Sequence, residues 1–191
     1  MNSILKRFLP DPYVRFVVSF IGLYFFLYYF NILYIGITAK GGMYVPFLDK
    51  YLNYIDWWRT FSLGASAKIL KWLDYSVLLN ETQLRVVGRY GISLVYECLG
   101  YGIMSVFTSF CLTFPSPFKH RFLFMLAGLI VIQFLNIWRF ILLVLYWNRR
   151  KPLFGMDHHD IFNIFIYTIL IIGCYLWIRH SSKTKNAQNA A

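Results

Sequence analysis

The stretch FLFMLAGLIVIQFLNIWRFILLVLYW, from Phe122 to Trp147, decides the fold class of this chain. It exceeds the roughly 20 predominantly apolar residues that a membrane-spanning helix needs. Within it, Asn136 and Arg139 stand three residues apart, so their side chains share one face of a helix. A charged residue inside a span costs about 3 kcal/mol and is by default a functional candidate. The alternative is an arginine whose long stem extends to the outer lipid head groups.

Three other runs are long and apolar enough to cross a membrane: Tyr13 to Thr38, a segment within Ile92 to Phe114, and Ile161 to Ile178. Of all 191 residues, 59% are hydrophobic and 14% are charged, which excludes a single soluble domain. Lipid tolerates no unpaired backbone, so each run is expected to be helical. We therefore predict an all-α integral membrane protein with about four transmembrane helices, in one domain over residues 1–180, followed by a disordered cytoplasmic tail at 181–191.

Basic residues flank the spans in an uneven pattern. The net charge is +11, and clusters stand before the first span, between the second and third, and after the fourth: Lys6, Arg7 and Arg15; Lys119 and Arg121; Arg179, Lys183 and Lys185. By the positive-inside rule the three segments that carry these clusters are cytoplasmic. The cluster at Arg149 to Lys151 then lies on the outer side, which opposes the rule, but the reverse orientation would place three clusters outside instead of one. Because the basic residues lie at the ends of apolar runs, anionic lipid head groups are their expected counter-charge, and nucleic acid is not expected as a partner.

The segment between the first two spans, from Ala39 to Tyr96, is expected on the outer side of the membrane. Four of its apolar residues share one helical face, with tryptophans nearby: Leu63, Ala67, Leu70 and Val77. This spacing predicts a helix lying in the outer interface. The stretch QLRVVGRYGISLVYE then alternates and contains a Gly-Arg-Tyr-Gly turn, which is typical of a short β-hairpin. The hairpin leads directly to Cys98.

Cys98 stands at the outer entrance of the second span, between Glu97 and the glycines Gly100 and Gly102. A thiol at a helix N-terminus is favoured in its thiolate form by unpaired N–H groups and by the helix dipole, and the thiolate is the nucleophile. The charge of Glu97 opposes this effect unless it pairs with an arginine. The alternative is that Cys98 is a small buried hydrophobic residue. The three cysteines show no metal or redox spacing, so neither a metal site nor a disulfide framework is expected.

The fourth span opens with DHHDIFN, residues 157–163, again on the outer side. Histidines beside acids act as acid and base, bind metal or sit in a wet loop, and the chain offers no third ligand at a suitable spacing for metal. The predicted topology brings Cys98, Arg139 and the His158–His159 pair to the same membrane face. A thiol nucleophile, an imidazole base and a cation for the developing oxyanion form a complete set for acyl transfer.

Three motifs, in this order, resemble those of the exosortase and archaeosortase family, which are multi-span cysteine transpeptidases or proteases of prokaryotic membranes. They are ECLG at Glu97 to Gly100, NIWR at Asn136 to Arg139, and HDIFN at His159 to Asn163. The family shows Cys followed closely by Gly, then Asn-x-x-Arg, then His-x-x-x-Gly. The resemblance spans Thr82 to Arg179, and the short chain is similar to the compact variants of Bacteroidetes. Leu99 and Asn163 stand where Ser and Gly are usual, which leaves the sorting motif open.

The resemblance implies a membrane-embedded cysteine transpeptidase or protease of the bacterial inner membrane, with its active site facing the periplasm. Such an enzyme cleaves the C-terminal sorting signal of an exported protein, formed by a motif, a span and a basic tail. It then passes the acyl group to an acceptor, and it uses no cofactor. Two alternatives stay open at this point: a non-catalytic membrane assembly or transporter subunit, and a cysteine acyltransferase acting on lipid.

The resemblance also implies roles for individual residues. Cys98 is the expected nucleophile, and Arg139 and His159 are its expected catalytic partners. His159, rather than its neighbour His158, matches the family spacing. Possible supporting residues are Glu97, Gly100, Asn136, His158, Asp160 and Asn163.

Overall fold

The computed structural model describes residues 11–39, 43–89, 91–146 and 158–189, with side chains except at 97, 158–161 and 181–189. Three of its helices are long and apolar enough to cross a membrane: α2 (Pro12–Thr38), α6 (Phe118–Tyr146) and the Phe162–His180 part of α7 (His158–Asn189). A shorter apolar helix, α5 (Tyr101–Thr113), packs with them. The expected all-α membrane architecture is confirmed.

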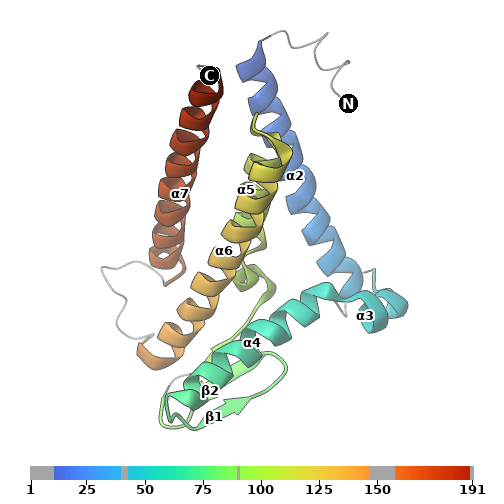
Figure 1. Ribbon diagram of the computed structural model, residues 1–191. Coiled ribbons are helices and arrows are strands. Elements are labelled where there is room, and N and C mark those ends of the chain that lie inside the picture. The colour runs from blue at the N-terminus through green and yellow to red at the C-terminus, as the bar shows by residue number, and fades with distance from the viewer. Residues whose placement is uncertain (1–10, 40–42, 90, 147–157, 190–191) are drawn as a thin grey trace.

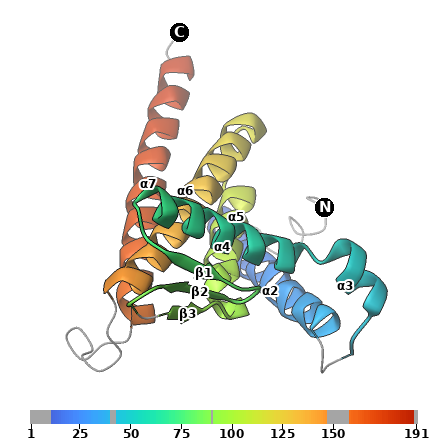
Figure 2. The same cartoon turned by 90° about the horizontal axis from the view of Figure 1, so that it is seen from below.

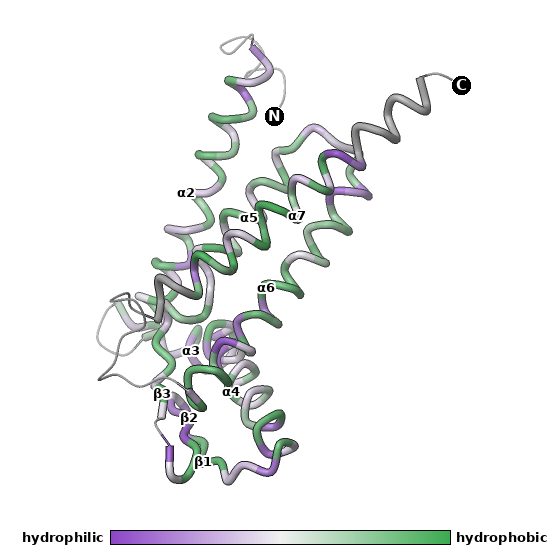
Figure 3. The backbone as a smooth tube through the Cα atoms, turned by 90° about the vertical axis from the view of Figure 1, so that its left-hand side faces the viewer, coloured by the Kyte–Doolittle hydropathy of each residue, from purple (hydrophilic) through white to green (hydrophobic). Residues whose placement is uncertain are grey.

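These four helices alternate in direction (Figure 1). The start of α2, the connection from α5 to α6 and the end of α7 lie at one end of the bundle, whereas a small sheet and helix α4 (Tyr54–Trp72) lie at the other. Hydrophobic residues dominate the four helices (Figure 3). Many of those on α2 and α7 are exposed, as expected of a surface that faces lipid.

The second span is shorter than the sequence predicts. Its helical part is only Tyr101–Thr113, because Gly91–Ser93 forms strand β3 and Gly100 takes a left-handed conformation with φ 80° and ψ 17°. Helix α7, in contrast, continues to Asn189 and so includes most of the tail for which the sequence analysis expects no fixed structure.

Helices α5 and α6 pack closely in the middle of the bundle. Phe107 and Cys111 on α5 form an apolar cluster with Ile132 on α6. A Cβ atom at Gly128 would lie 2.1 Å from the Phe107 ring, far inside van der Waals contact. Gly128 therefore sets how closely the two helices approach.

The opposite end of the bundle carries helix α3 (Pro46–Leu52), helix α4 and a three-stranded antiparallel sheet in the order β1-β2-β3 (Figure 2). The strands are β1 (Val77–Leu79), β2 (Gln83–Val86) and β3 (Gly91–Ser93). The predicted hairpin is β2 and β3, and β1 is a strand that the sequence analysis missed. The assignment of Val77 to the helix face is wrong, because α4 ends at Trp72 and Asp74 turns the chain with a φ of 62°.

Helix α4 buries one face against α6 and the sheet. Its buried residues Ile55, Leu63 and Leu70 belong to one core with Ile137, Phe140, Ile141 and Val144 of α6 and with Leu84 and Val86 of β2. Trp57, Phe61 and Trp72 on its other side are exposed, and such aromatic residues suit a membrane interface. The predicted apolar face of α4 therefore exists, and it covers the part of α6 that carries Asn136 and Arg139.

Candidate active site

Cys98 lies in a short 3-10 helix, η1 (Tyr96–Leu99), between the sheet and α5. Its N–H donates to the Val95 carbonyl over 3.0 Å, and the neighbouring Leu99 is fully buried in the core shared by α4 and α6. Leu99 therefore anchors the turn at the position where the resembled family usually has Ser. The expected position of Cys98 at the N-terminus of an α-helix is wrong, because Gly100, not Cys98, is the N-cap of α5.

Asn136 of α6 holds this turn in place. Its side-chain Nδ2 donates to the Cys98 carbonyl over 3.2 Å, and the residue is only 2% exposed. A Cβ at Gly100 would lie 3.6 Å from the same nitrogen, which is an ordinary contact. Gly100 is therefore favoured for its left-handed φ rather than for lack of space.

Arg139 lies one helical turn further along α6, and its guanidinium lies beside the Cys98 side chain, within reach of a charge interaction with it. Arg139 is 4% exposed and Cys98 is 7% exposed. The arginine is thus enclosed by protein, and the alternative in which it extends to lipid head groups does not describe it. The spacing Asn-x-x-Arg places two polar side chains on one face of α6, and both contact the same residue, Cys98.

The Arg139 guanidinium retains unused donors. Nε and Nη2 are buried and have no hydrogen-bond partner among the described residues. Leaving a buried donor unpaired costs about 1–3 kcal/mol, more for a charged group. Such donors are suited to a carbonyl oxygen that gains negative charge beside the sulfur, because the planar fork of arginine presents several N–H groups in fixed geometry.

The two histidines of the predicted site stand at the start of helix α7. Helix α7 begins at His158, but the side chains of His158, His159 and Asp160 lie outside the described residues, as does that of Glu97. In Figure 1 the start of α7 lies at the same end of the bundle as the end of α6. Asn163 is exposed on α7. The distance from either histidine to Cys98 is therefore not described, and their roles stay predictions.

A group of polar and aromatic side chains beside the Cys98 turn was missed by the sequence analysis. The Arg59 guanidinium of α4 pairs with Asp56 and lies over the Tyr96 ring, 5.5 Å from its centroid. The Tyr54 hydroxyl donates to Asn31 Oδ1 on α2 over 2.8 Å, and burial raises the pKa of Tyr54 above its ordinary value, so that the hydroxyl stays protonated. Apart from the Arg59–Asp56 pair within α4, these contacts join residues far apart in the chain, and no local pattern signals them.

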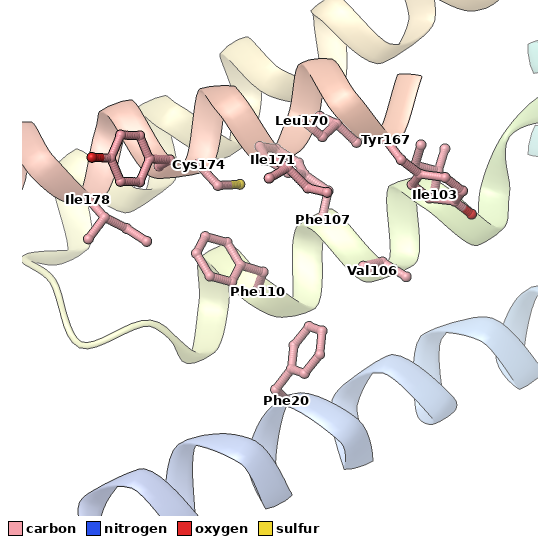
Figure 4. Close-up of a pocket in the computed structure, with 11 residues that line it drawn as sticks. Phe20, Ile103, Val106, Phe107, Phe110, Tyr167, Leu170, Ile171, Cys174 and Ile178 are labelled. Carbon is pink, nitrogen blue, oxygen red and sulfur yellow. The ribbon is translucent and has the colours of Figure 1, made fainter. Parts of the chain in front are cut away.

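Two cavities lie near these helices. One, of about 640 Å³, is lined by residues of α2 and of the segment around Cys98: Tyr28, Asn31, Ile32, Ile35, Val95, Tyr96, Tyr101 and Gly102. The other, of about 370 Å³, lies between α2, α5 and α7 (Figure 4). Its walls are apolar, with Phe20, Phe107 and Phe110 on one side and Leu170, Ile171 and Cys174 on the other. Only the first of the two adjoins the Cys98 turn.

Comparison with known proteins gives one family. The model of the transmembrane exosortases matches residues 11–181, which is most of the chain and includes Cys98, Asn136, Arg139 and His159. Comparison with curated proteins and with solved structures gives no match. Membership of this family supports a membrane transpeptidase-like role. Because the match extends from the start of α2 to the end of the last span, the chain belongs to the transmembrane exosortase family.

Proposed function

We propose that this protein is a membrane-embedded cysteine transpeptidase or protease that cleaves the C-terminal sorting signal of exported proteins on the extracytoplasmic side. The observation that carries the proposal is the contact between the Cys98 side chain and the buried Arg139 guanidinium, inside a chain of the exosortase family. A cation held against a cysteine favours the thiolate, which is the reactive form.

In the proposed first step, the Cys98 thiol gives its proton to His159, and the sulfur attacks the carbonyl carbon of the scissile peptide bond. A C–S bond forms, and the carbonyl oxygen becomes an oxyanion. The unpaired Nε and Nη2 groups of Arg139 are available to donate to it. Donors placed where charge develops in the transition state are usually the largest contribution to such catalysis.

The intermediate then collapses and the C–N bond breaks. The leaving amine, which carries the span and the basic tail, takes the proton from His159, and the exported domain stays on Cys98 as a thioester. An amine, a hydroxyl or water next attacks the thioester and gives its proton to His159. The Cys98 sulfur leaves and takes this proton back from His159, and the enzyme returns to its starting state.

The proposed position of the reaction follows from the helix ends. The η1 turn that holds Cys98 packs against α4, and α6, which holds Arg139, packs against α4 and the sheet. The start of α7 lies toward the same end of the bundle (Figure 1). The opposite end carries the start of α2, the start of α6 and the end of the last span, with Arg15, Lys119, Arg121 and Arg179, and the positive-inside rule assigns this end to the cytoplasm. In a bacterial inner membrane the site would face the periplasm, at the depth where the membrane anchor of an exported protein begins.

The proposal can be tested without knowing the sorting motif. A library of co-expressed reporters would join an exported domain to a short randomised segment, a leucine-rich span and a basic tail. Wild-type protein should cleave a subset of reporters at one position within the randomised segment. The variant Cys98→Ala should cleave none of them at an unchanged membrane level. Cleavage that persists in Cys98→Ala would contradict the proposal, and a library with no cleaved member would favour a non-catalytic subunit.

A further inference from the structure

The cavity of about 640 Å³ lies beside the residue that the proposed reaction uses. Val95 and Tyr96 precede Cys98 in the chain, Tyr101 and Gly102 follow it, and all four line the cavity. The opposite wall comes from the last turns of α2, at Tyr28, Asn31, Ile32 and Ile35. A chain that passes through the cavity would therefore run along the Cys98 turn, between α2 and the start of α5.

The size of this cavity suits a short stretch of peptide. Pockets for small ligands have volumes of about 300–1,000 Å³. A Cβ atom added at Gly102 would meet only the Tyr28 ring, at 3.9 Å, which is an ordinary contact. The space between α5 and α2 at this position is thus open, and a large side chain at residue 102 would extend into it.

The lining determines what the cavity can accept. It combines three tyrosine rings with Ile32, Ile35 and Val95, and none of the described residues that line it is charged. An ionised side chain placed there would lose its hydration without gaining a partner, which costs several kcal/mol and is avoided in folded proteins. Asn31 adds polarity but no charge, and its Oδ1 already accepts from Tyr54.

We propose that this cavity is the subsite for the residues next to the scissile bond, and that it selects an uncharged, apolar or aromatic side chain at that position. This inference rests on the proposed function, because it assigns the occupant as the peptide that Cys98 cleaves. The continuity of the lining with the Cys98 turn on both sides favours a peptide over a lipid chain, which would have no reason to follow the turn.

The first test measures which side chains the wild-type protein accepts beside the cleavage site. In the reporter library described above, the sequences that are cleaved should show one position beside the cleavage site occupied by apolar or aromatic residues and depleted of Asp, Glu, Lys and Arg. Cleaved sequences with a charged residue at every position near the cleavage site would overturn the inference while leaving the proposed reaction standing.

The second test changes the size of the cavity. Gly102→Trp should fill it and slow cleavage of the reporter preferred by the wild type by about tenfold or more, since single methylenes in such pockets already change rates by 10–200-fold. Gly22→Trp is the matched control and should act like the wild type, because Gly22 lies on α2 outside the lining of this cavity and a Cβ there meets no atom within 4 Å. Ile35→Ala should enlarge the cavity and shift the preference in the library toward larger side chains.

A third measurement separates a folding defect of Gly102→Trp from a loss of substrate binding. In Gly102→Trp, Cys98 should still react with a small thiol reagent, methyl methanethiosulfonate, at the wild-type rate, and the membrane level should be unchanged. Slow cleavage with normal thiol reactivity supports the subsite. Normal cleavage in Gly102→Trp, together with an unchanged side-chain preference in Ile35→Ala, would overturn the subsite assignment. The cavity would then be assigned to a lipid chain. Loss of cleavage in Cys98→Ala under the same conditions keeps the proposed reaction separate from this outcome.

Discussion

Cys98 and Cys111 are both buried, at 7% and 0% exposure, yet their surroundings differ. Cys111 lies on α5 in the middle of the bundle, in an apolar cluster with Phe107 and Ile132. Cys98 lies in a turn between the sheet and α5, where Arg139 contacts its side chain and Asn136 holds its carbonyl. Burial is therefore common to the two cysteines, and the polar groups around them differ. The proposed function assigns the reaction to the cysteine that has these polar neighbours.

The same contrast extends to the regions around the two residues. Tyrosines line both cavities, but the cavity beside the Cys98 turn also includes the amide side chain of Asn31, whereas the cavity near Cys174 in the middle of the bundle is otherwise apolar. Packing interactions dominate the first region, as at Gly128 against Phe107. In the second region, the Arg139 Nε and Nη2 groups have no hydrogen-bond partner within the part of the chain that the structure describes. We expect mutations in the first region to lower stability and mutations in the second to lower activity.

The largest effect is expected at Cys98. Cys98→Ala and Cys98→Ser should reduce reporter cleavage to below detection, because the nucleophile is absent or far weaker. Cys111→Ala and Cys174→Ala are the matched controls, and each should retain most of the wild-type rate. Cleavage would be followed by immunoblotting of the reporter at equal membrane levels of each variant. Equal behaviour of all three cysteines would remove the contrast between the two regions.

The histidines come next. His159→Ala should lower the cleavage rate by about 10²–10⁴-fold, the range over which general acid–base groups act. His158→Ala is the control, since the two side chains diverge by about 100° on a helix and cannot both face the same group. Loss of cleavage in His158→Ala with retention in His159→Ala would reverse the assignment, and survival of both would remove histidine from the mechanism.

Arg139→Lys should lower the cleavage rate by about 10²-fold without affecting insertion, because lysine keeps the charge but lacks the planar set of donors. Arg121→Lys provides a control on the same helix. Arg121 donates to the Leu112 carbonyl over 3.0 Å and lies at the opposite end of α6. Near-wild-type turnover of Arg139→Lys would show that a positive charge at residue 139 is sufficient for catalysis and that the planar set of donors is not needed.

A smaller loss of activity is expected at Asn136. Asn136→Ala removes a hydrogen bond to the Cys98 carbonyl, worth about 1 kcal/mol, and should slow cleavage by about fivefold through a looser turn. Gln133→Leu is the control, because Gln133 is equally buried on α6 but donates to Ser62 of α4 over 2.7 Å. If both variants slow cleavage alike, the effect comes from α6 packing and not from the turn.

The smallest effect on activity belongs to the apolar region. Gly128→Ala forces α5 and α6 apart at Phe107 and should destabilise the protein by about 2 kcal/mol, as overpacked cores do. Thermal unfolding in detergent would measure the loss, and the folded fraction should cleave reporters at the wild-type rate. Gly22→Ala is the control, since a Cβ there meets no atom within 4 Å.

The sequence predicts the spans and the polar face of α6 well. Apolar length identifies α2, α6 and α7, and the three-residue spacing of Asn136 and Arg139 places both on the side that contacts Cys98. These features depend only on local periodicity, so they can be read without knowledge of distant contacts.

Other features depend on tertiary contacts and could not be predicted. The 3-10 turn at Cys98 ends at Gly100 in a left-handed conformation, where the hydropathy pattern shows only a continuous apolar run. Strand β1 has no alternation and forms by pairing with β2. The contact of Arg59 with Tyr96, and the cavity beside it, join α4, α2 and the Cys98 turn across long separations in the chain.

The central claim, that Cys98 is the reacting sulfur, is tested most directly by trapping the acyl intermediate. A cleavable reporter would be incubated with the purified full chain, quenched in acid and analysed by mass spectrometry. We expect the exported domain of the reporter on Cys98, in a linkage that hydroxylamine releases. Reporter cleavage without any adduct on Cys98, or an adduct that persists in Cys98→Ala, would contradict the account.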